Sequence, residues 1–409
     1  MAIGDKKQIR DGPHPLGLHV ASAAQSWLGA AAAFPLFHLG GMQIHPSLKQ
    51  AADDLRREMA GKDLEKIQLT VMQKAQERLM DTLTGIRNYQ HQPYQRQMPP
   101  APLCCTLGST EVRDYGDNLP DQAPVVIVVP SLVNPAYILD LRQDHSFMRR
   151  MAAEGIHPYL IDWAAPGAEE LDFNLEDYIL KRLLPLIRKI HQRHNRKIHL
   201  LGYCMGGNLS LAAAQIMQPE DIIDSLTLMA TPWDFHADQP AHLPVLTEYF
   251  LKMPAAGQIA TSIPMNILHM FFFSLDPTLS GRKFRKFARF NPQDEQTRHF
   301  TAIEDWANQG MPLAPKVAQD CLINWYQQNQ TQQGCWRIAG QNIDPGLLTL
   351  PGHIITPNTD RIVPPASAVA LQKKLPHFTH TRAKGGHVTM IAGTTREVTL
   401  WHKIISYYK

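Results

Sequence analysis

One segment constrains the fold of this 409-residue chain more than any other. An apolar run, Ile198 to Leu201, leads into Gly-Tyr-Cys-Met-Gly-Gly, and the small, helix-forming residues Asn208 to Met217 follow. The glycines predict a turn so tight that a side chain at Gly202 or Gly206 would collide with neighbouring backbone. Cys204, at its apex, is expected to have a strained backbone conformation. We therefore predict a strand, a sharp turn that carries a cysteine, and a helix.

A cysteine at the start of a helix is well placed to act as a nucleophile. The positive end of the helix dipole favours the thiolate form of Cys204, which is the form that attacks. Taken alone, a Gly-x-Cys-x-Gly pattern is more often a small buried cysteine at a helix start. The strand before it and the helix after it favour the nucleophile. The glycines of the predicted turn are Gly202, Gly206 and Gly207.

Composition excludes several function classes. Apolar residues make up 44% of the chain and charged residues 19%, which is typical of a soluble globular protein. The formal charge of +3 is too small to indicate nucleic-acid binding. Five cysteines without repeated Cys-x-x-Cys spacing argue against a disulfide framework or a zinc site, and they favour a reducing cytoplasm. The apolar stretch Leu28 to Phe37 is too short to span a bilayer, so we expect no transmembrane segment.

The pattern along the chain predicts four regions. Residues 1–99 are expected to be helical, because apolar residues recur there every three or four positions. Over 100–235 and 340–409, short apolar runs alternate with helical segments, which predicts an α/β fold: a mostly parallel sheet with helices on both faces. Residues 236–339 interrupt this alternation and are rich in aromatic residues and methionine. We interpret them as a cap inserted over the carboxyl edge of the sheet.

Two later segments supply the acid and the histidine that a nucleophilic cysteine needs. Asp360 follows the predicted strand 352–356, and His387 follows the predicted strand 378–382. Both lie beyond the carboxyl ends of their strands, at the same sheet edge as Cys204. We expect Asp360 to orient His387 and His387 to take the thiol proton. Nucleophile, acid and histidine in this chain order are typical of the α/β-hydrolase fold, here with cysteine in place of serine.

Attack on a carbonyl also requires two backbone N–H donors for the resulting oxyanion. The N–H of Met205, directly after the nucleophile, is the first candidate. The second should come from the loop after the strand 125–129, and we assign it to Leu132 or Val133.

These residues resemble the polyhydroxyalkanoate synthases, above all their catalytic domain. The resemblance runs from about Val125 to Phe235 and from Gly352 to Gly393. Its most specific segments are Pro130–Leu141, Ile161–Trp163, Asp177–Ile179, Gly202–Gly207 and Thr231–Phe235. The family's Cys-Asp-His triad corresponds to Cys204, Asp360 and His387. The chain differs from common family members in its cap and in Arg361, which follows the acid where they have histidine.

The resemblance implies an acyltransferase that uses a coenzyme A thioester as substrate and holds no bound cofactor or metal. Its cysteine would accept a 3-hydroxyacyl group and pass it to a hydroxyl acceptor, which extends a polyester. One alternative is a thioesterase or polyester hydrolase of the same fold, and another is a granule-associated binding protein with weak activity. Expected partners are 3-hydroxyacyl-CoA, the surface of a polyester granule, and either further copies of the chain or a separate subunit. The expected location is the cytoplasm.

Three further signals remain weaker. Asp162, at a strand end, is an alternative acid, but Asp360 fits the chain order better. The adjacent thiols Cys104 and Cys105 are expected to be inert, because neighbouring cysteines rarely reach disulfide geometry without strain. The basic segment 282–289 is compatible with binding coenzyme A phosphates or a granule surface, and equally with a solvated helix face.

Overall fold

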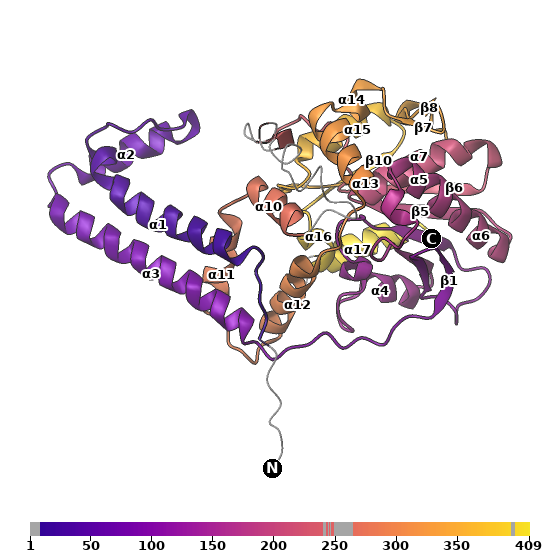
Figure 1. Ribbon diagram of the computed structural model, residues 1–409, viewed down its shortest axis with the longest axis horizontal. Coiled ribbons are helices and arrows are strands. Elements are labelled where there is room, and N and C mark those ends of the chain that lie inside the picture. The colour runs from indigo at the N-terminus through magenta and orange to yellow at the C-terminus, as the bar shows by residue number, and fades with distance from the viewer. Residues whose placement is uncertain (1–8, 240–242, 244, 246, 249–264, 394–396) are drawn as a thin grey trace, which may run out of the picture. The chain divides into compact units, whose positions relative to one another are not determined.

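The computed structural model describes residues 9–239, 243, 245, 247–248, 265–393 and 397–409 (Figure 1). The chain forms two compact units. The first, which we call the helical unit, contains Met1–Gln95 and Asp276–Glu304. The second, which we call the core unit, contains Arg96–Leu275 and Asp305–Lys409. Residues 276–304 thus group with the N-terminal helices, whereas the sequence analysis assigned them to the cap.

Aromatic packing explains this grouping. Helix α11 (Leu279–Phe287) buries Phe284 and Phe287 against Ile86 and Tyr89 of helix α3 (Leu64–Gln90). A Cβ atom on Gly85 would lie 1.9 Å from the carbonyl oxygen of Phe284, so only glycine permits this close approach. The other helices of this unit are α1 (Leu16–His38), η1 (Pro46–Leu48), α2 (Lys49–Met59) and the first part of α12 (Glu295–Gln309).

Helix α1 corrects an expectation from the sequence. It runs without interruption for 23 residues, through Gly29 and Pro35, whereas the sequence analysis counted only the ten residues from Leu28 to Phe37. By length and composition alone it could cross a membrane, and only 11% of its most apolar window is buried. A core helix of a soluble protein or a signal sequence can have the same length and composition. The length of this helix therefore removes the reason for expecting no transmembrane segment.

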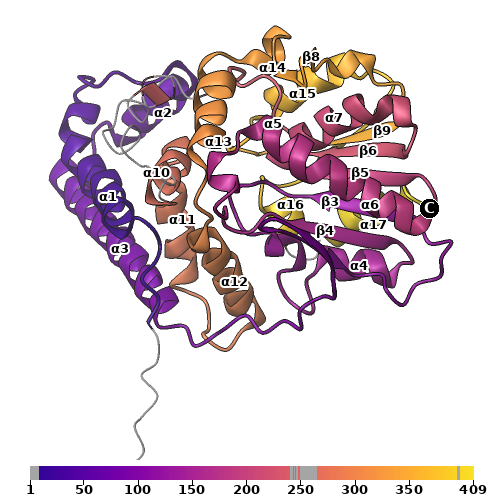
Figure 2. The ribbon, with the colours of Figure 1, turned by 45° about the vertical axis from the view of Figure 1, so that its right-hand side comes forward.

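The core unit is built on an eight-stranded sheet with the strand order β1-β2-β4-β3-β5-β6-β9-β10. The strands are β1 (Leu103–Leu107), β2 (Thr110–Asp114), β3 (Val125–Val129), β4 (His157–Asp162), β5 (Ile198–Tyr203), β6 (Ile223–Met229), β9 (Gly352–Pro357) and β10 (Thr379–Ala383). The pairs β1-β2 and β2-β4 are antiparallel, and all other neighbours are parallel. The predicted, mostly parallel sheet is confirmed. Figure 2 shows its strands side by side with helices around them.

Helices cover the sheet and explain why β3, in its middle, is buried at all five positions. They are η2 (Ala136–Asp140), α4 (Phe147–Ala153), η3 (Glu170–Asp172), α5 (Leu175–Tyr178), η4 (Ile179–Leu183), α6 (Leu184–His194), α7 (Met205–Met217), η5 (Gln218–Glu220), η7 (Pro345–Leu347), α15 (Pro365–Lys374), α16 (Thr389–Ala392) and α17 (Glu397–Ser406). A π-helical turn, η4, stands just before α6, whose second residue is Pro185. Proline has no N–H to donate, so the preceding turn can widen.

The segment between β6 and β9 contributes the cap of the core unit. Its described elements are α10 (Met265–Leu275), the end of α12, α13 (Pro315–Gln319), η6 (Asp320–Gln327), α14 (Gln330–Gln333) and the small hairpin β7 (Arg337–Ile338) with β8 (Gln341–Asn342). Helix α13 continues directly into η6, which is π-helical. π-Helical turns are rare and often occur at functional sites.

Candidate active site

Cys204 occupies the sharp turn between β5 and α7. Its backbone has φ +57° and ψ −129°, a conformation that side-chain-bearing residues rarely adopt. The flanking glycines are required because a Cβ atom on Gly202 would lie 2.4 Å from the Cα of Gly207. On Gly206 it would lie 2.0 Å from the carbonyl oxygen of Val129. The turn predicted from the sequence is therefore present.

His387 and Asp360 form a buried pair at the same sheet edge. Nδ1 of His387 lies 2.7 Å from Oδ2 of Asp360, and the other carboxylate oxygen accepts the N–H groups of Ile362 and Val363 at 2.8 and 2.9 Å. Asp360 acts as the acceptor in this arrangement, so we assign the proton of its hydrogen bond with His387 to Nδ1. This leaves Nε2 of His387 free to face the nucleophile.

The electrostatics of His387 link it to Cys204. Burial alone would lower the pKa of His387, but the negative charges of Asp360 and Cys204, and its hydrogen bonds to both, raise the pKa well above its ordinary value. An imidazole with a raised pKa is a strong proton acceptor. The structure therefore brings all three predicted residues, Cys204, Asp360 and His387, into one interacting group.

Tyr203 is a contact that sequence reasoning missed. Its hydroxyl donates to the backbone oxygen of His387 over 3.0 Å, and its ring stacks on the imidazole with centroids 5.3 Å apart. Burial raises the pKa of Tyr203 well above its ordinary value, so the phenol remains a donor. The signal available in the sequence was its position, directly before the nucleophile.

The structure distinguishes between the proposed oxyanion donors. Val133 donates its N–H to the hydroxyl of Ser131 at 3.2 Å, whereas among the described residues no backbone or side-chain acceptor takes the N–H of Leu132. Leu132 is therefore the better second candidate beside Met205, which begins α7 and has a free first-turn N–H. The backbone oxygen of Val133 accepts the N–H of Met311 at 3.0 Å.

A second hydrogen bond joins this loop to the cap. Nε1 of Trp306, at the end of α12, donates to the backbone oxygen of Pro135 over 2.8 Å. Together with the Met311 bond, it fixes the cap segment 306–311 to the loop that follows β3.

An apolar pocket of about 80 Å³ opens beside the nucleophile. The turn contributes Cys204 and Met205, and the loop after β3 contributes Ser131 and Val133. The cap supplies most of the remaining wall, largely with bulky side chains: Leu268, Phe271, Phe272, Leu313, Leu322, Trp325 and Tyr326. This apolar enclosure would exclude water from a group bound to the cysteine. The predicted cap thus contributes directly to the candidate site.

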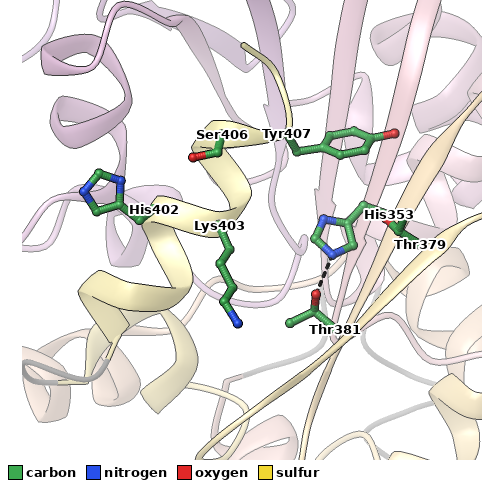
Figure 3. Close-up of a pocket in the computed structure, with 7 residues that line it drawn as sticks. All are labelled: His353, Thr379, Thr381, His402, Lys403, Ser406 and Tyr407. Atoms are coloured by element: carbon green, nitrogen blue, oxygen red, sulfur yellow. Dashed lines mark hydrogen bonds between the residues drawn. The ribbon is translucent and has the colours of Figure 1, made fainter.

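A larger hollow, about 620 Å³, lies elsewhere on the core unit and contains none of the predicted site residues. Figure 3 shows its wall: His402, Lys403 and Ser406 from α17, Tyr407 directly after that helix, and His353, Thr379 and Thr381 from β9 and β10. These strand residues lie near the amino ends of β9 and β10, away from the carboxyl ends that precede Asp360 and His387. Volume alone therefore does not identify the active site here.

The weaker sequence signals also have defined positions. Asp162 accepts the N–H of Ala164 at 3.1 Å and does not line the pocket, which favours a structural role. In the basic segment, Arg282 pairs with Asp276 and Lys283 with Glu304, at 2.8 and 2.6 Å within the helical unit. In the part of the chain that the structure describes, no group of three or more His, Cys, Asp or Glu side chains is arranged to hold a metal ion.

Residues 124–394 match the family model of the alpha/beta hydrolase fold, so the chain belongs to this fold family. Within it, the chain belongs to the family of the poly(3-hydroxyalkanoate) polymerase subunit PhaC. It is 29% identical to the subunit of Allochromatium vinosum over 67% of this chain and 78% of the relative. It is 30% identical to that of Synechocystis sp. over 65% of this chain and 72% of the relative. It is 26% identical to that of Haloferax mediterranei over 69% of this chain and 58% of the relative.

Solved structures of much lower sequence identity are also similar to this chain. A monoacylglycerol lipase from Paleococcus ferrophilus has a TM-score of 0.45 and 14% identity, covering 73% of this chain and 98% of that structure. The thioesterase domain from the curacin biosynthetic pathway has a TM-score of 0.40 and 15% identity, covering 76% of this chain and 99% of that structure.

Proposed function

We propose that this protein is an acyltransferase of the poly(3-hydroxyalkanoate) synthase type. Cys204 accepts a 3-hydroxyacyl group from a coenzyme A thioester and passes it to the hydroxyl end of a growing polyester. The observation that carries the proposal is the interaction of Cys204, His387 and Asp360 beside a water-excluding pocket. The membership of the PhaC family supports the substrate class.

The first half-reaction loads the enzyme. His387 takes the thiol proton of Cys204, and the sulfur attacks the thioester carbonyl. The oxyanion that forms accepts hydrogen bonds from the N–H groups of Met205 and Leu132. When the carbon–sulfur bond to coenzyme A breaks, His387 returns the proton to the leaving thiolate. One thioester replaces another, so most of the free energy of the thioester is retained.

The second half-reaction extends the chain. His387 takes the proton of the acceptor's 3-hydroxyl, whose oxygen attacks the acyl group on Cys204. The carbon–sulfur bond breaks, an oxygen ester forms, and the thiolate of Cys204 recovers the proton from His387. The transfer from thioester to oxygen ester provides the driving force. These steps move only protons and the acyl group, so the reaction requires no bound metal or organic cofactor.

The pocket favours a synthase over a hydrolase of the same fold. Water can replace the acceptor hydroxyl in the second step, and then the product is free hydroxy acid. The apolar cap side chains around Cys204 oppose this by leaving little space for water. A binding protein with weak activity is the least favoured alternative, because it would have no need of the hydrogen bond from His387 to Asp360 or of the raised pKa of His387.

The site of action that we propose is the cytoplasm, at the surface of the polyester granule. There the growing chain and 3-hydroxyacyl-CoA are both within reach. The relatives are named as polymerase subunits, which supports an assembly with further copies of this chain or with a separate subunit. Light scattering of the purified protein, with and without polyester, tests the assembly.

Incubation with 3-hydroxybutyryl-CoA tests the activity. We expect release of free coenzyme A together with insoluble polyester or soluble oligomers. Cys204→Ala should abolish the release, whereas Cys335→Ala, which changes an exposed free cysteine, should leave it intact. Free hydroxy acid in proportion to the thiol would favour the hydrolase. If the wild type released no coenzyme A but bound polyester granules, the enzyme assignment would be wrong.

A further inference from the structure

Tyr326 contributes a hydroxyl to the largely apolar pocket beside Cys204. Tyr326 lies in the π-helical element η6, where the N–H of Gln328 donates to the oxygen of Ile323 five residues earlier, at 2.8 Å. The wider turn places Cys321, Trp325 and Tyr326 along the wall of the same pocket. This geometry makes η6 a candidate for substrate recognition.

The ring of Tyr326 is held from two sides. It packs edge to face against Phe235 and Phe271, with centroids 5.1 and 5.0 Å apart. Its backbone oxygen contacts Nε2 of His236 at 3.1 Å. A side chain held in this way loses little conformational freedom when its hydroxyl binds a ligand.

The hydroxyl of Tyr326 is available to form a hydrogen bond with a ligand. In the described ranges, no residue forms a hydrogen bond with it. Burial, followed by the negative charges of Cys204, Cys321 and Asp360, raises the pKa of Tyr326, so the phenol remains protonated and can donate. Ser131, the other hydroxyl in the pocket wall, already accepts the N–H of Val133.

We propose that the Tyr326 hydroxyl binds the 3-hydroxyl of the acyl group carried by Cys204, and that it thereby selects 3-hydroxyacyl groups over plain acyl groups. This assignment rests on the proposed function. A largely apolar pocket with a small number of polar groups is the usual arrangement for fixing a small substrate. A plain acyl chain would fill the same space but leave the phenol unpaired, which costs binding free energy.

The test compares two thioesters on wild type and Tyr326→Phe. In single-turnover experiments, free thiol reports the acylation of Cys204 by 3-hydroxybutyryl-CoA and by butyryl-CoA, which lacks only the 3-hydroxyl. We expect wild type to prefer the hydroxy substrate by about tenfold, the effect of one hydrogen bond. In Tyr326→Phe this preference should disappear, because the rate constant falls for the hydroxy substrate and changes less than about twofold for butyryl-CoA.

Tyr178→Phe is the matched control. Tyr178 is buried against Trp163 and Phe173, outside the pocket, so its removal should leave the substrate preference intact. An unchanged preference in Tyr326→Phe would overturn the assignment. An equal loss with both substrates would also overturn it, because Tyr326 would then act on the thioester carbonyl or on folding. If wild type reacted with neither thioester, the proposed function itself would fail, and this result is distinct from the other two.

Discussion

The hydroxyl of Tyr203 donates to the backbone oxygen of His387 over 3.0 Å, so the residue before Cys204 holds the histidine that we propose as its general base. Tyr203 and His387 are 184 positions apart in the sequence. Ring stacking adds a second contact between them. The relative position of sulfur and imidazole therefore depends on a side chain that takes no part in the chemistry.

Tyr203→Phe should slow the acylation of Cys204 by about tenfold. The substitution removes one hydrogen bond and leaves the buried carbonyl of His387 unpaired, so the histidine can move relative to the sulfur. Rapid-quench measurement of coenzyme A release gives the rate constant, and the pH–rate profile should also shift. Tyr408→Phe, which loses a buried bond to Thr227 instead, should change stability only. Equal acylation rates in wild type and Tyr203→Phe would show that the contact does not position His387.

Phe272→Ala should divert product from polyester to free hydroxy acid. Phe272 lines the pocket and packs against Phe271, so its loss opens space for water beside the acyl-cysteine. Chromatography of soluble acid against total coenzyme A released measures the partition. Phe290→Ala, in the aromatic cluster of the helical unit, is the matched control. The shielding role of the cap would be refuted by an unaltered ratio of acid to coenzyme A.

Gly206→Ala should destabilise the core unit by about 3 kcal/mol. The added Cβ atom would lie 2.0 Å from the carbonyl oxygen of Val129. The backbone of the turn and the backbone at Val129 must therefore move apart to relieve the clash. Urea unfolding followed by tryptophan fluorescence measures the loss. Gly281→Ala on α11 has open space around it and should be neutral or slightly stabilising. Similar midpoints for the two variants would argue against a rigid turn.

The stability should fall below neutral pH in a way that depends on His353. Burial and the charge of His380 lower the pKa of His353 to about 4, whereas an unfolded histidine titrates at about 6.5. Between these values the unfolded chain binds a proton that the folded chain does not, so this contribution to stability is present above pH ~6.5 and is lost as the pH falls towards 4.

His353→Gln should remove this dependence. Between pH 7 and pH 4.5 it should lose about 2 kcal/mol less unfolding free energy than wild type. Urea titrations at pH 7 and pH 4.5 provide the comparison. The exposed His377, substituted in the same way, should leave the wild-type dependence unaltered. Parallel stability curves for wild type and His353→Gln would contradict the lowered pKa.

The parts of the site that follow local rules were predictable from the sequence. The turn at Cys204 follows from glycine sterics, and Asp360 and His387 follow from their positions after parallel strands. The strands β1 and β2 were missed, because a short antiparallel pair with exposed and polar residues lacks a continuous apolar run. Their register shifts between Leu103 and Cys105, which disrupts the alternation that a pattern search needs.

The residues that escaped prediction depend on contacts between distant segments. Tyr326 and Phe271 belong to the pocket only because η6 and α10 fold back beside the turn. The sequence pattern likewise could not show that Phe284 packs against α3 and so separates residues 276–304 from the cap. The sequence analysis measured only the continuous apolar stretch from Leu28 to Phe37, whereas α1 begins at Leu16 and includes polar residues such as His19 and Gln25.

The two hydrogen bonds from Trp306 and Met311 to the loop after β3 connect the cap to the backbone around Leu132, the second oxyanion donor that we propose. A polyester that lengthens beside Cys204 must leave past cap residues. Any displacement of the segment 306–311 during its exit would also move Leu132 and weaken the oxyanion contact. The exit of the polyester and the rate of the next addition would then be linked through this segment. An exiting chain that displaced the segment would slow the addition of the next unit.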